Sequence, residues 1–128
     1  MLDVYVGGSY LLRIKRIYEE PSLEDGYRIL VDKLWPRGIS KERARLDYWA
    51  KDITPSSELR KYFCHDASKF IEFSRRYTLE LESNEASVEF INLLKDKLIE
   101  GNITLIYASK DPYINHATVL KTWLEQKL

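Results

Sequence analysis

The stretch Gly26-Tyr27-Arg28-Ile29-Leu30-Val31-Asp32-Lys33-Leu34-Trp35-Pro36-Arg37-Gly38 decides the fold that this sequence predicts. Its consecutive apolar residues at 29–31 indicate a strand buried on both faces, which is typical of a parallel sheet covered by helices. We expect this strand to span residues 27–34. Because it ends in Trp-Pro-Arg-Gly (35–38) rather than in small polar turn residues, its end is the first candidate for a binding site.

Two further segments of the chain are expected to pair with this strand. Residues 103–108 form a second buried apolar run, and residues 11–18 alternate between apolar and basic side chains. Helices predicted between the two buried strands make a right-handed crossover, which leaves those strands parallel. We therefore predict an α/β fold with a small, mainly parallel sheet flanked by helices. It forms a single domain over residues 11–128, preceded by an N-terminal extension over residues 1–10.

Several helix ends can be predicted from capping residues. Ser40, Asp66 and Asn115 are expected N-caps, and Thr54-Pro55 is expected to begin a helix that runs through Phe63. The next helix after Asn84 should stop at a left-handed Gly101. Its expected buried stripe consists of Val88, Ile91, Leu94 and Leu98.

The composition limits the classes of protein to which the chain can belong. It has 128 residues with 20 basic and 20 acidic side chains, whereas a general nucleic-acid binder carries a positive excess. No segment approaches the roughly 18 apolar residues that a membrane span needs. No signal peptide is recognisable, so we expect a cytoplasmic protein. The single cysteine, Cys64, excludes an intramolecular disulfide, and we expect it to be buried and inert.

Residues 27–41 resemble the signature of the YeaO-like proteins, which are small bacterial and archaeal proteins with a domain of unknown function. The resemblance covers about residues 13–128 and implies an α/β fold without an established activity. Beyond the signature, it is carried by Trp49, Pro55-Ser-Ser-Glu-Leu-Arg60, His65-Asp66, Leu105-Ile-Tyr-Ala-Ser-Lys-Asp111 and Asn115-His116-Ala117.

One departure from the broader relatives affects the chemistry that the resemblance implies. Those relatives carry a cysteine and a Cys-His-Arg cluster around the last strand and helix. Here Tyr107 and Asn115-His116-Ala117 occupy that region, so the resemblance does not extend to thiol chemistry.

Parallel strands end at the same edge of a sheet, so residues 35–38 should lie near residues 109–111 and the start of the last helix. This edge is where open α/β sheets bind ligands. Arg37 offers a planar cation for a carboxylate or phosphate. The alternative is a structural salt bridge with Asp47 or Asp66. The expected ligand-binding residues are Arg28, Trp35, Arg37, Gly38, Lys41, Lys110, Asp111 and Asn115.

Asp32, His65 and His116 are the candidates for acid/base catalysis, if the protein catalyses a reaction. The two histidines are the only side chains with ordinary titration near neutrality, and Asp32 lies near the end of its strand. The alternatives are that the histidines cap or pack helices, and that Asp32 pairs with Arg28 on the same strand face. Two histidines with scattered carboxylates do not match a metal-ligand spacing, so we expect no metal and no cofactor.

Two functional hypotheses follow. The first is an enzyme or sensor that binds a small anionic ligand, a phosphate or carboxylate compound, at the C-terminal edge of the sheet. The second is a non-catalytic interaction or regulatory module that binds nucleic acid through Lys41, Arg43 and Arg45. The zero net charge and the lack of a helix-turn-helix pattern argue against nucleic acid. The sequence leaves the oligomeric state open, including a homo-oligomer.

Overall fold

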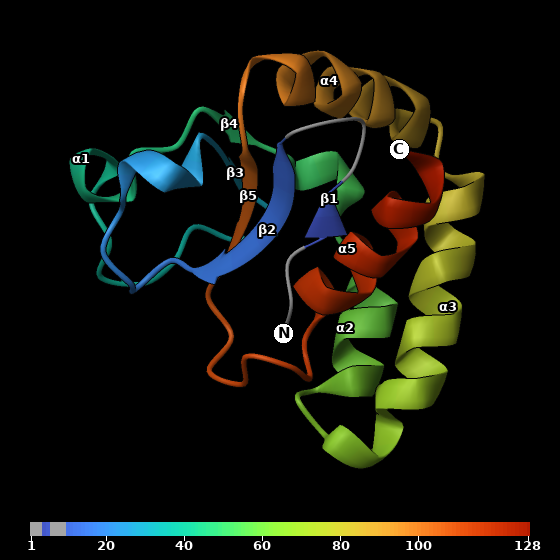
Figure 1. Cartoon of the computed structure of the whole chain (residues 1–128). Coiled ribbons are helices and arrows are strands. Elements are labelled where there is room, and N and C mark those ends of the chain that lie inside the picture. Colours follow the sequence, from blue (N-terminus) through green and yellow to red (C-terminus); the bar gives the residue numbers. More distant parts are fainter. Residues whose placement is uncertain (1–3, 6–9) are drawn as a thin grey trace.

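Within the residues that the structure describes, the sheet has five strands in the order β1-β2-β5-β3-β4 (Figure 1). The computed structural model describes residues 4, 5 and 10–128. β2, β5, β3 and β4 run parallel, and β1 pairs with β2 in the antiparallel direction. This confirms the α/β class and the predicted parallel pairing of the two buried strands. The strands are β1 (Val4–Tyr5), β2 (Leu11–Arg16), β3 (Tyr27–Leu30), β4 (Tyr48–Trp49) and β5 (Ile103–Tyr107).

β5 is the central strand, and every one of its residues is buried. Leu105 pairs with Ile14 of β2 and with Ile29 of β3, so apolar side chains lie side by side across three strands. The regular strand β3 ends at Leu30, four residues earlier than the sequence predicts. Val31 nevertheless extends the ladder, because its N–H donates to the carbonyl of Ile106. The chain leaves the sheet only after Val31.

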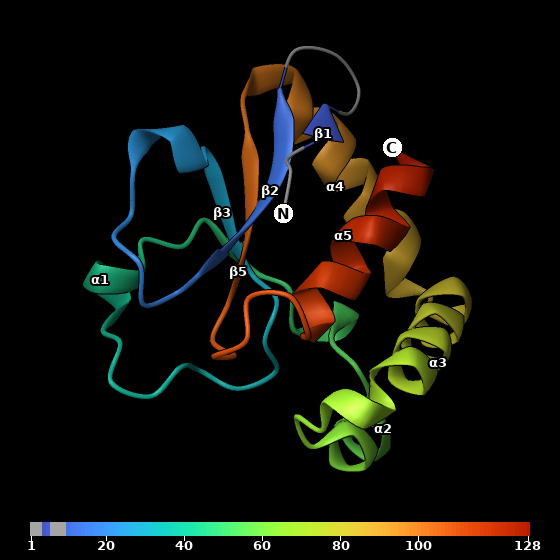
Figure 2. The same cartoon turned by 60° about the horizontal axis from the view of Figure 1, so that its bottom comes forward.

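Helices cover the two faces of the sheet unequally (Figures 1 and 2). α2, α3, α4 and α5 gather on one face, whereas α1 and the loops around it lie on the other face. In the part of the chain that the structure describes, no helix is both long and apolar enough to cross a membrane. The helices are α1 (Lys41–Ala44), α2 (Ser57–Phe63), α3 (Phe70–Ser83), α4 (Ala86–Glu100) and α5 (His116–Lys127), with short 3₁₀ helices at Leu23–Asp25, Lys51–Ile53 and Ala67–Lys69.

Each face of the sheet has its own apolar core. The larger core lies under α2–α5 and includes Phe73, Tyr77 and Trp123. The smaller core lies on the face of α1, where Leu30 and Ile106 pack with Trp35 and Trp49. The sheet is therefore buried on both faces, as its continuous apolar runs predict.

The predicted N-caps Ser40, Asp66 and Asn115 are confirmed, since each side chain accepts a backbone N–H in the first turn that follows. The start of α2 differs from the prediction: Ser56 is its N-cap, two residues after Thr54. Gly101 has φ 175°, so the predicted left-handed cap is wrong.

The predicted buried stripe of α4 needs one correction. Val88 is 65% exposed, and Phe90 is buried in its place. Leu94 and Leu98 are buried as predicted. A stripe drawn through Phe90, Leu94 and Leu98 follows the steps of four that one face of a helix requires.

A buried ion network lies at the opposite end of β3 from the site described below. Asp25 Oδ2 accepts from Arg28 Nη1 at 2.6 Å, and Asp25 Oδ1 lies 3.0 Å from Lys15 Nζ. Burial alone would raise the pKa of Asp25, but hydrogen bonds from Ser22, Lys15 and Arg28 lower it below its ordinary value. The Arg28 guanidinium also donates twice to the carbonyl of Ala44. The predicted alternative of an Arg28–Asp32 ion pair is therefore wrong.

Candidate functional site

A cleft lies at the C-terminal edge of the parallel strands, between the segments that follow β3 and β5 and the start of α5. Two cavities of about 330 Å³ and 640 Å³ form it, and both are lined by Asp32, His65, Ser109 and His116. We call the first cavity the Arg60 lobe and the second the Lys110 lobe. The other residues of the Arg60 lobe are Val31, Lys33, Leu34, Thr54, Pro55, Arg60, Phe63, Phe73 and Asn115, and those of the Lys110 lobe are Arg16, Tyr18, Ala108, Lys110, Asp111 and Ile114.

The three residues expected to move protons all line this cleft. Asp32 follows β3, His116 is the first residue of α5, and His65 follows α2. They come from segments far apart in the chain. The topology brings them together because β3 and β5 end at the same edge and α5 starts there.

Asp32 and His116 are in direct contact. His116 Nε2 lies 2.7 Å from Asp32 Oδ1 and 3.0 Å from the carbonyl oxygen of Val31. Both neighbours are acceptors, so Nε2 carries a hydrogen. The contact with Oδ1 is close but is not directed as a hydrogen bond, so the buried Oδ1 has no hydrogen-bond partner among the described residues. Oδ2 of the same carboxylate accepts the N–H of Ala108, just after β5.

Asn115 fixes the place of His116. Its Oδ1 accepts the N–H of Thr118 as the N-cap of α5, and its Nδ2 donates to the carbonyl of Asp111. The side chain is buried and both ends of its amide are engaged. Its role is to hold the helix start against the loop, although it also lines the Arg60 lobe.

His65 is held in the cleft by an unusual backbone. Its φ is 58° and that of Cys64 is 43°, so two consecutive non-glycine residues adopt the left-handed region. For a residue with a side chain, this conformation is less favourable than the right-handed one by roughly 1–2 kcal/mol. The His65 ring lies 6.1 Å from the ring of Phe63, a wall of the Arg60 lobe.

The prediction that Cys64 is buried is wrong, because the residue is exposed. It ends α2 in the left-handed region, where its N–H donates to the carbonyl of Arg60. A residue in that position turns the chain away from the helix and out of the core. The sequence signal was weak, because the cap residue at such a position is usually glycine.

Arg60 is a residue of the cleft that the sequence analysis did not predict. It extends from α2 into the wall of the Arg60 lobe, and its Nε is buried without a hydrogen-bond partner. Among the described residues, no carboxylate pairs with its guanidinium. The only signal in the sequence was its place in the segment 55–60 that carries the family resemblance.

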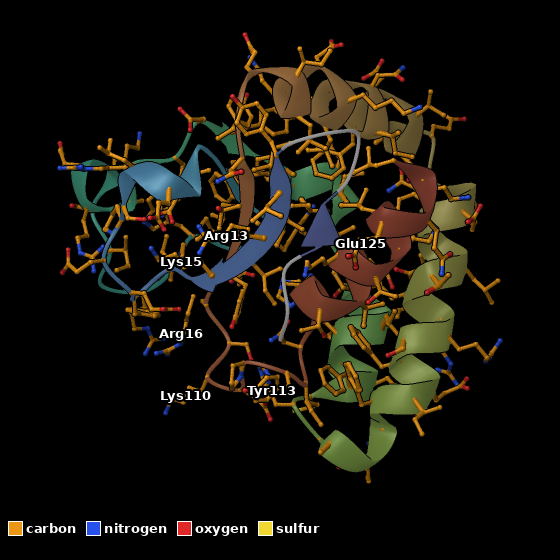
Figure 3. The ribbon with its side chains drawn as sticks, in the orientation of Figure 1. Arg13, Lys15, Arg16, Lys110, Tyr113 and Glu125 are labelled. Carbon is orange, nitrogen blue, oxygen red and sulfur yellow. The ribbon has the colours of Figure 1, made fainter. Side chains whose placement is uncertain are left out.

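The Lys110 lobe also has cationic side chains. Arg16 Nε donates to the carbonyls of Ala108 and Ser109, and its guanidinium lies 4.6 Å from the Tyr18 ring centroid. Figure 3 shows Arg16 and Lys110 on the same side of the molecule, below the tip of β2. Lys110 is a predicted ligand residue that lines the cleft, whereas Arg16 was not predicted.

Asp111 lines the Lys110 lobe, but its carboxylate serves the loop. Oδ1 accepts the N–H groups of Tyr113 and Ile114. These two hydrogen bonds lower the pKa of Asp111, and the bond from Ile114 has the larger effect. Asp32 and Asp111 line the same lobe, yet each is hydrogen-bonded to backbone elsewhere.

The remaining predicted ligand residues lie outside the linings of the two lobes. Arg28 belongs to the buried ion network, and Trp35 donates from Nε1 to the carbonyl of Ile39 in the smaller core. Arg37, Gly38 and Lys41 are exposed. The carbonyl of Arg37 accepts from the hydroxyl of Tyr18. The two acidic partners considered for the Arg37 side chain are engaged elsewhere: Asp47 accepts the N–H of Arg28, and Asp66 caps a 3₁₀ helix.

In the described ranges, no group of three or more His, Cys, Asp or Glu side chains is arranged to hold a metal ion. The titratable donors of the cleft are two imidazoles and two carboxylates, and each carboxylate, Asp32 and Asp111, already accepts backbone N–H groups.

Residues 11–128 match the sequence pattern of a family described as "Inactive DUF488-N3 subclade". The chain is 43% identical to the uncharacterised protein YeaO of Escherichia coli K12 over 113 residues, which are 88% of this chain and 96% of that protein. It is 38% identical to the uncharacterised protein Rv3073c of Mycobacterium tuberculosis H37Rv over 109 residues, 85% of this chain and 89% of the relative. No solved structure matches significantly.

Proposed function

Because the chain belongs to the inactive DUF488-N3 subclade, we propose that its cleft binds a small anionic compound without transforming it. The ligand is a carboxylate or phosphate compound, held at the C-terminal edge of the sheet. The observation that carries this proposal is Arg60, a cation in the cleft wall whose buried Nε has no partner.

Arg60 is half-buried, and the buried donor of its guanidinium, Nε, has no acceptor among the described residues. A buried donor without an acceptor is unfavourable, and a bound anion would supply that acceptor. Arginine presents a planar fork of donors that matches a carboxylate or phosphate. The free protein thus carries a cost that a ligand of the right charge would offset.

The other charges of the cleft favour an anion as well. Its two acidic groups are engaged: Asp32 faces His116 and the N–H of Ala108, and Asp111 accepts backbone N–H groups. The side chain of Lys110, by contrast, has no ion-pair partner among the described residues. α5 also directs the positive end of its dipole towards the cleft, since it begins at His116.

Binding without catalysis agrees with the arrangement around His116. In hydrolases that use a histidine base, a serine or cysteine donates to the ring. Within the described residues, no hydroxyl or thiol donates to the His116 ring, whose Nε2 faces Asp32 and Val31. Cys64, the single thiol of the chain, is outside the linings of both lobes.

The alternative of a nucleic-acid-binding module has less support. Arg43, in the middle of the proposed basic surface, donates to the carbonyls of Tyr18 and Glu19 and lies 3.6 Å from Glu20. Its charge is therefore partly used within the protein. A basic surface for phosphates needs cations that are free to meet them.

The test is a titration of the whole chain with sodium acetate and with sodium phosphate, followed by backbone amide NMR. We expect saturable shifts in the residues around Arg60, and a loss of binding of at least tenfold in Arg60→Gln. Lys61→Gln removes the same charge from the next, exposed residue of α2 and should bind as the unmodified chain does. Arg37→Lys should also leave binding unchanged if the site is the cleft. Equal binding by Arg60→Gln and Lys61→Gln would overturn the proposal.

A further inference from the structure

We infer that the ligand of the Arg60 lobe is an anion that carries a planar apolar body, such as an aromatic carboxylate. This inference rests on the proposed function, because it assigns the anionic group of the ligand to Arg60. It adds the chemistry of the rest of the molecule, which the walls of the lobe define.

The walls around Arg60 are largely apolar. Phe63, Phe73, Pro55 and Val31 line the lobe together with Arg60. Phe63 and Phe73 stack with ring centroids 4.3 Å apart, so the wall they contribute is an aromatic one. The four apolar residues are buried (Phe73 is 1% and Phe63 6% exposed), so the apolar surface of the lobe that still faces water belongs chiefly to Leu34. A ligand with an apolar body would cover that surface, whereas an inorganic anion would satisfy the arginine alone.

The rim of the Arg60 lobe also carries apolar and aromatic side chains. Leu34 lines the cavity although its side chain is 72% exposed, so a ligand that fills the lobe would cover it. On another segment, His65 places its ring near that of Phe63. A planar group entering between Leu34 and His65 would meet an aliphatic and an aromatic surface. Planar rings pack well against aromatic side chains in offset or edge-on arrangements.

The size of the lobe limits the ligand to a small molecule. Its volume of about 330 Å³ is at the lower end of the range for small-molecule pockets, roughly 300–1,000 Å³. That is enough for a single ring with a carboxylate. The adjoining Lys110 lobe has two cationic side chains, Arg16 and Lys110, at its wall and is the better place for a purely inorganic anion.

The experiment compares three probes by the same NMR titration: sodium benzoate, sodium acetate and the neutral benzamide. We expect benzoate to bind at least tenfold more tightly than acetate, which corresponds to about 1.4 kcal/mol. Benzamide should bind at least tenfold more weakly than benzoate, because it lacks the charge that meets Arg60. The shifted amides should be those around Arg60, Phe63 and Leu34.

Two variants locate the two halves of the ligand. Arg60→Gln should weaken benzoate at least tenfold, with Lys61→Gln as its matched control. If Arg60→Gln does not fold, Arg60→Lys replaces it: this variant keeps the charge but loses the planar fork, so it should also weaken benzoate. Leu34→Ser changes an exposed side chain and so leaves the fold intact. It should weaken benzoate by about threefold and leave acetate unchanged.

The outcomes separate this inference from the proposed function. Acetate or inorganic phosphate binding in the Arg60 lobe as tightly as benzoate overturns the apolar body and leaves the anion site standing. Benzamide binding as tightly as benzoate overturns the anion site itself. No binding of benzoate, acetate or phosphate overturns both.

Discussion

Oδ1 of Asp32 lies 2.7 Å from Nε2 of His116, so the residue that follows β3 touches the first residue of α5. Oδ2 of the same carboxylate accepts the N–H of Ala108, after β5. One side chain thus connects the ends of two parallel strands and the start of the last helix. The floor of the cleft depends on it.

Asp32→Ala should lower the free energy of unfolding by about 1–3 kcal/mol, because it leaves the N–H of Ala108 without its acceptor. His116→Ala should cost less, since Asp32 can still accept from Ala108. Urea denaturation of the two variants checks this difference. A larger loss in His116→Ala would show that the strand ends are not what Asp32 stabilises.

Asp25→Asn should lower the free energy of unfolding by about 3–5 kcal/mol at neutral pH. It removes the counter-charge of Arg28, whose side chain is only 4% exposed. Glu24→Gln, a change in the adjacent exposed residue, should stay within about 0.5 kcal/mol. Denaturant unfolding of both variants provides the measurement.

The unmodified chain and Asp25→Asn can also be compared as a function of pH. The pKa of Asp25 is lowered in the folded state, so its carboxylate adds stability above its ordinary pKa of about 4. That stability is lost as the pH falls through the lowered value. The difference in the free energy of unfolding between the unmodified chain and Asp25→Asn should therefore narrow progressively below about pH 4. A gap that stays constant down to pH 2 contradicts the assignment.

Gly26→Ala should be far more damaging than Gly38→Ala, although both glycines have positive φ, 64° and 78°. A Cβ at Gly26 would lie 2.1 Å from the carbonyl oxygen of Asn102, whereas a Cβ at Gly38 meets open space. We expect losses of about 2–5 kcal/mol and about 1 kcal/mol respectively. Thermal unfolding compares them, and equal losses would mean that the chain can shift away from Asn102.

Cys64→Gly should stabilise the protein by about 1 kcal/mol, because glycine adopts the left-handed region without the penalty of a side chain. Cys64→Ala removes the thiol but keeps the Cβ, so it should leave the melting temperature nearly unchanged. If both variants shift stability equally, the thiol rather than the backbone is responsible.

The parts of the fold that could be predicted are those with a local signal. The apolar runs at 29–31 and 103–106 identify the buried strands. The capping residues Ser40, Asp66 and Asn115 identify where helices begin. Each signal lies within a few residues of the feature it predicts. The parallel pairing of the strands needed only the handedness of crossover connections in addition.

The site could be predicted only in part. Asp32, His65 and His116 line one cleft together with Lys110, Asp111 and Asn115, whereas the sequence left open whether the first three residues meet in space. Arg60 could not be found, because its isolation depends on which acidic groups fail to reach it in three dimensions. The role of Arg28 could not be predicted for the same reason. It pairs with Asp25 across a 3₁₀ turn that the strand pattern does not reveal.

The central strand of the sheet is the last to be synthesised. β5 pairs with both β2 and β3, so Leu12 and Tyr27 lie on either side of Ile103. A growing chain that has not yet reached residue 103 has both strands but not the neighbour that they share. One edge of each strand then has no partner, and unpaired edges favour aggregation. Final folding therefore waits for the last fifth of the chain, and a truncation before residue 103 would remove the middle of the sheet rather than its end.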